Sequence, residues 1–529
     1  MKLQYATLKD AFWQDKGYQL PQYDVAAVAA KTQAEPTWLH LGAGNIFRAF
    51  LANAQQNLLN QGAADTGIIV AEGFDGEIIH KVYRPFDNLS IFARLKGDRS
   101  VDKIVLASVT DALVMDEDFA RLQEIAASPS LQMISLTITE KGYQIKDKDK
   151  NYYPVVAEDF HAGTGNPKSY IGKIVALLLA RYRAGGTPIA MVSMDNMSHN
   201  GEKLRHVILK FARNWQENAH VEAAFVDWLS SGKVTFPWSM IDKITPRPDD
   251  SVAAMLKADG VEAMDAVITE KKTYVAPFVN AEELEYLVIE DDFPNGRPAL
   301  DKAGVMFANR DTVNKVETMK VTTCLNPIHT ALAIYGCLLG YSSIHEEMKD
   351  AQLKALAEAV GYKEGLPVVV NPQILEPKQF IDEVVKVRLP NPFIPDTPQR
   401  IASDTSQKLA IRFGETIKSY LASDSLKVED LVAIPLVFAG WCRYLLGIDD
   451  AGNAFECSPD PLLAAAQEKV AGLALGSSDL GNIKELLSDS SIFGVNLYEV
   501  GLGEKVEGYV RELLAGTGAV RATLQKYLG

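Results

Sequence analysis

The chain has 529 residues, a formal charge of −15 and a hydrophobic fraction of 47%. The acidic balance argues against nucleic acid or a membrane surface as a partner, and the length exceeds what one hydrophobic core usually supports, so we expect two domains. The four cysteines form no CxxC pair, and the first ten residues lack the apolar stretch of a secretory signal. These features predict a cytoplasmic protein with reduced thiols and no disulfide framework, zinc site or transmembrane span.

Short apolar strands alternate with helical patterns in the first half of the chain. Strands are predicted over 38–41, 67–71, 131–137 and 188–193, and a helix over 45–60. Such an alternation is typical of a parallel sheet covered by helices on both faces. From about Thr312 onward the patterns are mostly helical. Helices are predicted there over 331–339, 351–360, 380–387 and 431–446.

A glycine-rich turn lies between the first predicted strand and the helix that follows it. Gly42 permits a tight turn, and Gly44 lets the backbone approach a pyrophosphate that sits on the free N–H groups of the helix start. The predicted cofactor-binding residues of this turn are Gly42, Gly44, Asn45, Ile46, Phe47 and Arg48. Phe47 stands where the usual fingerprint has its third glycine, so an ordinary strand-to-helix turn is the alternative interpretation.

An acidic residue after the second strand would accept hydrogen bonds from the adenosine ribose and favour NAD over NADP. Glu72 and Asp75 are the two candidates, and no arginine lies between Gly67 and Ile79. Each carboxylate could instead be a solvated loop residue. Together with the turn, these positions predict an α/β fold, with a Rossmann-like NAD-binding domain over 1–300 followed by a mainly α-helical substrate domain over 301–529.

The stretch from Lys320 to His329 combines an amine, the Asn326 carboxamide and an imidazole. A carbonyl that accepts a hydride develops negative charge on its oxygen, which needs hydrogen-bond donors and an acid. A lysine with a lowered pKa can serve as that acid where the sequence suggests no zinc site. The stretch therefore predicts a metal-independent alcohol dehydrogenase.

Short motifs spread over most of the chain carry a resemblance to a known family. They lie at 41–49, 135–143, 193–201, 236–246, 288–291, 296–298, 317–320, 325–329, 400–408 and 440–444. Each is short, but their joint order is highly specific. The chain resembles the long-chain, metal-independent polyol and aldonate dehydrogenases of the mannitol dehydrogenase family, and is most similar to the branch that acts on mannonate and fructuronate.

The resemblance implies a role for each matching residue. Lys320 would be the general acid and base, Asn196 and Asn326 would hold the reacting oxygen, and His329 would orient the substrate. The remaining implied residues are Arg400, Lys408 and Asp242, which would contact substrate, and Glu317, which would lie on the proton path from the lysine to solvent.

Each of these residues also has an ordinary structural interpretation. Glu317 and Lys320, three residues apart, could form an exposed helix pair of a few tenths of a kcal/mol. His329 could be a hydrogen-bonded helix histidine, and Asn196 could belong to a plain turn after a strand. Asp242 could cap a helix or pair with Lys243. Because these residues occur together in the order typical of the family, the functional interpretation is favoured over the structural one.

The spacing of Lys320 and Asn326 departs from the family pattern. The two residues are six apart, whereas the family commonly spaces them five apart. One extra residue in a regular helix rotates everything beyond it by about 100°. We therefore expect either a π-turn, with Thr322 and Thr323 as plausible places, or a loop before the next helix, with Pro327 near that helix start. We also expect the tips of Lys320 and Asn326 to converge on one oxygen.

Three substrate classes compete within the family: mannonate/fructuronate, polyols such as mannitol or arabinitol, and altronate/tagaturonate. The motifs favour mannonate and fructuronate, with a polyol dehydrogenase as the main alternative. A hexonate needs a cationic anchor, for which Arg400, Lys408 and Arg388 are candidates, although the first two also match positions in polyol enzymes. A protein that senses NAD(H) without catalysis is a further alternative. The sequence leaves the oligomeric state open.

Overall fold

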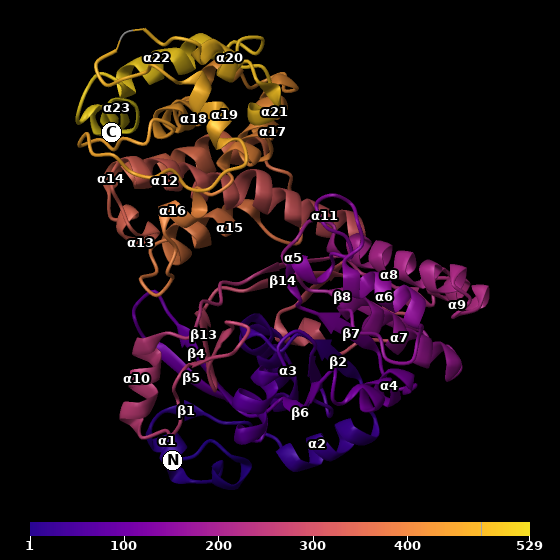
Figure 1. Ribbon diagram of the computed structural model, residues 1–529. Helices are drawn as coiled ribbons and strands as arrows, with labels where there is room; N and C mark the ends of the chain where they lie inside the picture. Colours follow the sequence, from indigo (N-terminus) through magenta and orange to yellow (C-terminus); the bar gives the residue numbers. More distant parts are fainter. Residues whose placement is uncertain (478) are drawn as a thin grey trace. The chain divides into compact units, whose positions relative to one another are not determined.

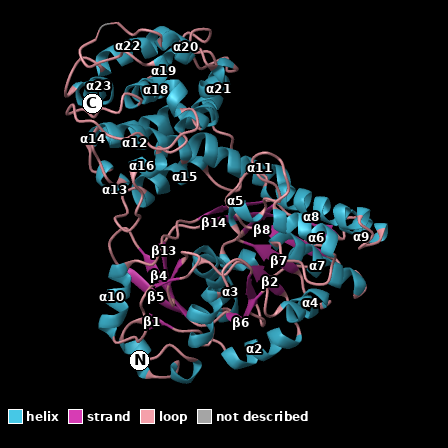
Figure 2. Ribbon diagram, in the orientation of Figure 1, coloured by secondary structure: helices cyan, strands magenta, loops and turns pink. Residues whose placement is uncertain are grey.

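A computed structural model describes residues 1–477 and 479–529 and divides the chain into two compact units, Met1–Asn314 and Lys315–Gly529 (Figure 1). Figure 2 shows sheet and helix in the first unit and helices in the second. The predicted α/β fold with a mainly helical C-terminal part is therefore confirmed. Among the described residues, no helix is both long enough and apolar enough to cross a membrane.

The main sheet of the first unit has the strand order β6-β3-β2-β7-β8-β9, and every neighbouring pair is parallel. Its strands are β2 (Trp38–Leu41), β3 (Ile68–Glu72), β6 (Val109–Val114), β7 (Met133–Leu136), β8 (Ile189–Ser193) and β9 (Val234–Thr235). The central strands are buried along their whole length, as strands covered on both faces must be. The four strands predicted from the sequence are confirmed.

Helices cover both faces of this sheet, and alternate strand residues enter two separate cores. Leu39 and Leu41 face the core formed with α4, α7, α8 and α9, whereas Trp38 faces the core formed with the helix after the glycine turn. The helices of this unit are α1 (Ala11–Asp15), α2 (Val25–Ala34), α3 (Asn53–Asn60), α4 (Phe119–Ala127), α5 (Thr139–Gly142), α6 (Pro154–Ala162), α7 (Tyr170–Arg183), α8 (Asn200–Glu217), α9 (Ala223–Ser230) and α10 (Asp250–Asp259). The strand order reverses between β2 and β7, which is where open α/β sheets bind ligands at the carboxyl ends of their strands.

Smaller sheets complete the first unit. One has the order β1 (Tyr18–Gln19), β5 (Val101–Leu106), β4 (Ser90–Leu95) and β13 (Phe278–Glu282). The others are β10 (Ser239–Asp242) with β14 (Tyr286–Glu290) and β15 (Met306–Ala308), and the hairpin of β11 (Val267–Ile268) and β12 (Tyr274–Val275). Helix α11 (Arg310–Met319) contains the division between the two units.

The second unit is built around α12 (Asn326–Leu338), whose residues are nearly all buried. Its other helices are α13 (Ile344–Glu347), α14 (Ala351–Glu358), α15 (Pro377–Glu383), α16 (Pro398–Ile401), α17 (Glu415–Leu421), α18 (Ala433–Tyr444), α19 (Leu463–Lys469), α20 (Ile483–Leu487), α21 (Ser490–Phe493), α22 (Gly503–Leu513) and α23 (Ala519–Leu528). The helices predicted over 331–339, 351–360, 380–387 and 431–446 correspond to α12, α14, α15 and α18. Their existence is confirmed.

Several helices of both units contain π-helical turns. These are η2 (Phe47–Ala52), η3 (Ile79–Tyr83), η6 (Lys320–Cys324), η7 (Ala359–Gly365), η9 (Val384–Arg388) and η11 (Ala410–Gly414). Short 3-10 turns are η1 (Tyr5–Thr7), η4 (Arg84–Phe86), η5 (Leu300–Ala303), η8 (Leu366–Val368), η10 (Thr405–Gln407) and η12 (Val428–Asp430). Because π-turns are rare and often mark functional sites, η2 and η6, which hold predicted site residues, are of particular interest.

Candidate active site

The glycine turn follows β2 at the switch point of the main sheet. Gly42 has φ +109°, and a Cβ there would collide with the carbonyl oxygen of Thr137, so only glycine fits. A Cβ on Gly44 would meet nothing within 4 Å, which leaves its backbone open to a ligand. The helix then begins at Asn45, and the N–H groups of its first turn have no partner within the helix. This arrangement suits a phosphate.

The side chains just after the turn are directed into the protein. Phe47 is fully buried and stacks on His40 with ring centroids 4.3 Å apart. The buried Arg48 guanidinium donates to the carbonyl of Ala276 at 2.7 Å and to Asn45 Oδ1 at 2.9 Å. Because both side chains point into the protein, Phe47 can offer a dinucleotide only its backbone N–H. The backbone N–H of Arg48 already donates to the carbonyl of Gly44 at 3.3 Å. Ile46 is half-buried beside them.

Glu72, at the end of β3, ties the glycine turn to the strand. Its Oε2 accepts a hydrogen bond from the Ala43 N–H at 2.9 Å. Its Oε1 accepts from the N–H groups of Phe74 and Asp75 at 2.7 and 3.1 Å. A carboxylate has about four acceptor positions, so three bonds leave room for a ribose hydroxyl.

Asp75 occupies a different environment from Glu72. Its Oδ2 accepts the hydroxyls of Thr269 and Thr273, each at 2.6 Å, and the side chain is 2% exposed. These contacts fasten the loop after β3 to the β11–β12 hairpin. The geometry therefore favours Glu72 over Asp75 as the ribose ligand.

Asn196 lies exposed on the loop between β8 and α8, at the carboxyl end of the sheet. Its neighbour Asp195 fixes this loop, because the carboxylate accepts from the N–H groups of Ile138 and Thr139 at 3.0 and 2.8 Å and from the Tyr143 hydroxyl at 2.7 Å. Burial raises the pKa of Asp195. The sequence interpretation did not assign a role to Asp195 or Tyr143, although both lie in motifs of the family resemblance.

Asp242 is the last residue of β10 and is buried. Its neighbour Lys243 pairs with Glu285 at 2.7 Å and donates to the carbonyl of Glu282 at 3.0 Å. The Lys243 ammonium is therefore engaged with Glu285 and Glu282, and the substrate role of Asp242 stays a prediction.

In the second unit, Lys320 begins the π-turn η6 and is 4% exposed. The backbone then breaks at Leu325, with φ −130° and ψ −61°, and α12 starts at Asn326 with Pro327 in its first turn. Of the two predicted arrangements, the π-turn is the one observed, and it includes Thr322 and Thr323. The predicted position of Pro327 near the helix start is confirmed.

Lys320 is buried, so Glu317 and Lys320 do not form a pair of two exposed helix residues. Glu317 is half-buried on α11, one turn before the lysine. No group of three or more His, Cys, Asp or Glu side chains within 1–477 and 479–529 is arranged to hold a metal ion.

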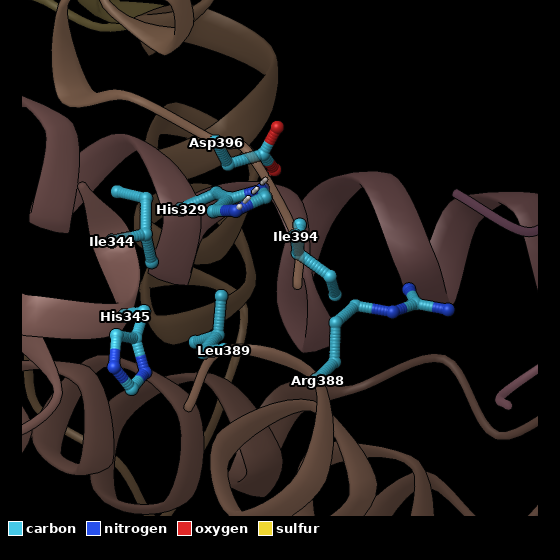
Figure 3. A pocket seen from close by; sticks show the side chains of 7 residues that line it. All are labelled: His329, Ile344, His345, Arg388, Leu389, Ile394 and Asp396. Atoms are coloured by element: carbon cyan, nitrogen blue, oxygen red, sulfur yellow. Dashed lines mark ion pairs between the residues drawn. The ribbon is translucent and has the colours of Figure 1, made fainter. Parts of the chain in front are cut away.

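His329 lies on α12 at the edge of a small cavity (Figure 3). The cavity is lined by His329, Ile344, His345, Arg388, Leu389, Ile394 and Asp396. His329 Nε2 approaches Asp396 Oδ2 to 3.5 Å, and Asp396 also forms an ion pair with Arg400. No sequence motif pointed to Asp396, because it approaches His329 from a distant part of the chain.

Charged neighbours surround His329. Burial lowers the pKa of His329 to about 4, although the Asp396 carboxylate opposes this shift. Three arginines on neighbouring segments add to the lowering: Arg388, Arg412 and Arg400. His329 is consequently neutral at physiological pH and can donate or accept a hydrogen bond.

Lys408 lies near these arginines but is held by the backbone. Its half-buried ammonium donates to the carbonyls of Ile401, at 3.3 Å, and Ser403. Burial lowers its pKa, and Arg412 and Arg400 lower it further. The sequence interpretation missed Arg412, whose only sequence signal is its helical spacing, four residues after Lys408.

A Rossmann-type sheet with a glycine turn at its switch point, followed by a helical unit carrying a buried lysine, defines a dinucleotide-dependent oxidoreductase. Residues 36–302 match the mannitol dehydrogenase Rossmann domain, and residues 312–513 match the mannitol dehydrogenase C-terminal domain. The chain belongs to the mannitol dehydrogenase family.

Relatives over the full length support this assignment. The chain is 51% identical to the D-mannonate oxidoreductase of Thermotoga maritima, over 100% of this chain and 99% of that protein. It is 28% identical to the solved mannitol 2-dehydrogenase of Pseudomonas fluorescens, a complex with NAD and D-mannitol, with a TM-score of 0.70 and 99% of each chain covered. A substrate-free D-sorbitol dehydrogenase shares the fold, with 24% identity, a TM-score of 0.79 and coverage of 96% and 97%.

Proposed function

We propose that the protein is an NAD-dependent oxidoreductase that interconverts D-mannonate and D-fructuronate. The observation that carries the proposal is the 51% identity to D-mannonate oxidoreductase along both whole chains, against 28% for the mannitol 2-dehydrogenase of known structure. The substrate is a small sugar acid, and the protein acts in the cytoplasm.

The first unit fits the cofactor. The open backbone at Gly44 and the helix start at Asn45 suit the pyrophosphate, and Glu72 has an acceptor position left for the adenosine ribose. When bound, the nicotinamide supplies the hydride for reduction or takes it in oxidation.

The second unit supplies the proton chemistry in this proposal. Lys320, largely removed from water, acts as the general acid in reduction and the general base in oxidation. Asn326 donates a hydrogen bond to the oxygen on which charge develops, and Asn196 is proposed for the same task. Glu317 is proposed to pass the proton between Lys320 and solvent. No metal is required by this scheme.

Substrate positioning is the proposed role of four further residues. His329, neutral at physiological pH, forms a hydrogen bond with a substrate hydroxyl. Arg400, Lys408 and Asp242 are proposed to contact the substrate as well. In this proposal, the Asp396 carboxylate orients both His329 and Arg400 through its ion pairs with them.

The test is NADH oxidation by the purified protein in the presence of EDTA, with D-fructuronate, D-tagaturonate and D-fructose assayed in parallel. Fast turnover restricted to fructuronate is the expected result. Preferential turnover of fructose would make the protein a polyol dehydrogenase, and preference for tagaturonate would place it with the altronate enzymes. NADH binding without any turnover would point to a sensing protein, and loss of activity with EDTA would refute the metal-independent scheme.

A further inference from the structure

Arg412 is bonded to Thr330, a residue of α12 that lies next to the proposed site residues His329 and Asn326. Its Nη1 donates to the hydroxyl oxygen of Thr330, which directly follows His329 on α12. The Thr330 hydroxyl in turn donates to the carbonyl of Asn326 at 2.9 Å. Arg412 itself lies in η11, one turn after Lys408, to whose carbonyl its N–H is bonded at 3.0 Å.

The charge of Arg412 is not balanced by an acid. In the described parts of the chain, 1–477 and 479–529, its guanidinium forms no ion pair, and burial lowers its pKa to about 10 without any opposing carboxylate. A charge removed from water is costly unless an opposite charge accompanies it. The side chain is half-buried, so it is not fully enclosed by the protein.

The other cations near His329 are already engaged. Arg400 forms an ion pair with Asp396, and the ammonium of Lys408 donates to two backbone carbonyls. Figure 3 shows the guanidinium of Arg388 directed away from the His329 ring. Compared with Arg400 and Lys408, Arg412 therefore has more capacity to receive an anion.

We propose that Arg412 binds the carboxylate of the substrate and so selects a sugar acid over a neutral polyol. This inference rests on the proposed function. A guanidinium carries five N–H donors in a planar fork that matches a carboxylate with two parallel hydrogen bonds. One donor of Arg412 is used on Thr330, which fixes the side chain and leaves the rest of the fork for the ligand.

The experiment compares Arg412→Gln and Arg412→Lys with the wild type on D-fructuronate and D-fructose, at saturating NADH. The two substrates differ in whether a carboxylate or a hydroxymethyl group ends the chain. Glutamine keeps a donor for Thr330 but removes the charge. We expect Arg412→Gln to raise KM for fructuronate and lower its kcat/KM by about 10- to 100-fold. Turnover of fructose should be unchanged, and Arg412→Lys should show a smaller loss confined to fructuronate.

The control variant is Lys418→Gln, which removes an exposed cation from α17 and should leave both substrates unaffected. NADH fluorescence titration and thermal unfolding check that the variants are folded; if Arg412→Gln does not fold, Arg412→Lys carries the comparison. Where fructose turnover is too slow to measure, inhibition constants for D-mannonate and D-mannitol replace it, and only the constant for mannonate should change.

Two outcomes would overturn the inference: wild-type KM for fructuronate in folded Arg412→Gln, or an equal loss on both substrates, which would make Arg412 a structural residue. A wild-type protein that reduces fructose but not fructuronate would instead refute the proposed function itself, before any variant is made, and the carboxylate anchor with it.

Discussion

The backbone N–H of Leu325 donates a hydrogen bond of 3.2 Å to the carbonyl of Lys320, five residues earlier. This bond closes the π-turn η6, which holds one residue more than an α-helical turn. The six-residue spacing of Lys320 and Asn326 is thereby absorbed locally, before α12 begins. The Thr322 hydroxyl supports the turn by donating to the carbonyl of Thr318 at 2.8 Å.

The first prediction concerns the length of this turn. Deleting Thr322 should convert η6 into a regular helical turn and leave a folded enzyme with substantial activity. Inserting one alanine after Thr322 should rotate α12 by about 100° relative to Lys320 and lower kcat by at least about 100-fold. Steady-state kinetics and circular dichroism of both variants test this. Equal losses from deletion and insertion would show that the π-turn itself is needed.

The second prediction concerns proton transfer. Lys320→Ala should lower kcat by roughly 10²- to 10⁴-fold while NADH binding survives, because only the acid is lost. Asn326→Ala should cost about 2–4 kcal/mol of transition-state stabilisation if its carboxamide holds the oxygen. The exposed Lys418→Ala is the matched control. Near-normal turnover of Lys320→Ala would remove that lysine from the mechanism.

The third prediction separates the two carboxylates after β3. Glu72→Ala should weaken NADH binding and reduce the preference for NADH over NADPH, because Glu72 contacts the glycine turn. Asp75→Ala should leave NADH affinity nearly unchanged but destabilise the first unit by about 1–3 kcal/mol, since the hydroxyls of Thr269 and Thr273 lose their acceptor. Cofactor titration and thermal unfolding distinguish the two. The reverse pattern would assign the ribose to Asp75.

The fourth prediction is a pH dependence that arises from His329. Its pKa is about 4 in the folded protein and about 6.5 when unfolded, so the unfolded chain binds the proton first. The stability due to neutral His329 is complete above pH 6.5 and is lost as pH falls towards 4, by up to about 3 kcal/mol. His329→Gln should therefore show a shallower fall of Tm between pH 7 and 4.5. The exposed His206→Gln should keep the wild-type slope, and an identical slope in both variants would contradict the assignment.

The fifth prediction concerns Glu347, a fully buried carboxyl whose two oxygens form no hydrogen bond with any described residue. Burial raises its pKa well above the ordinary 4.5. Its stability contribution is present below pH 4.5 and is lost as pH rises towards the raised pKa. Glu347→Met should therefore raise stability by about 1–3 kcal/mol at pH 8, and by less at pH 4.5. The exposed Glu346→Gln is the control; a destabilised Glu347→Met at pH 8 would contradict this account.

Much of the fold could be predicted from local pattern. The apolar strands and the helical periodicity of the second half are set by residues close in sequence, and both are confirmed. The sequence predicts the π-turn as one of two arrangements, because two threonines and a proline restrict where the helix can change its geometry. The functional boundary near residue 300 and the convergence of Lys320 and Asn326 stay predictions.

The order of motifs in the sequence determined the family, the glycine turn and the residue types available for chemistry. Only the tertiary structure decided how each charge is compensated. It bonded Glu72 to the turn and Asp75 to a distant hairpin, and placed Asp396 beside His329 and Arg400. Within the described residues it left Arg412 without an acid. These contacts join residues far apart in the chain, so they depend on packing and burial, which no local pattern encodes.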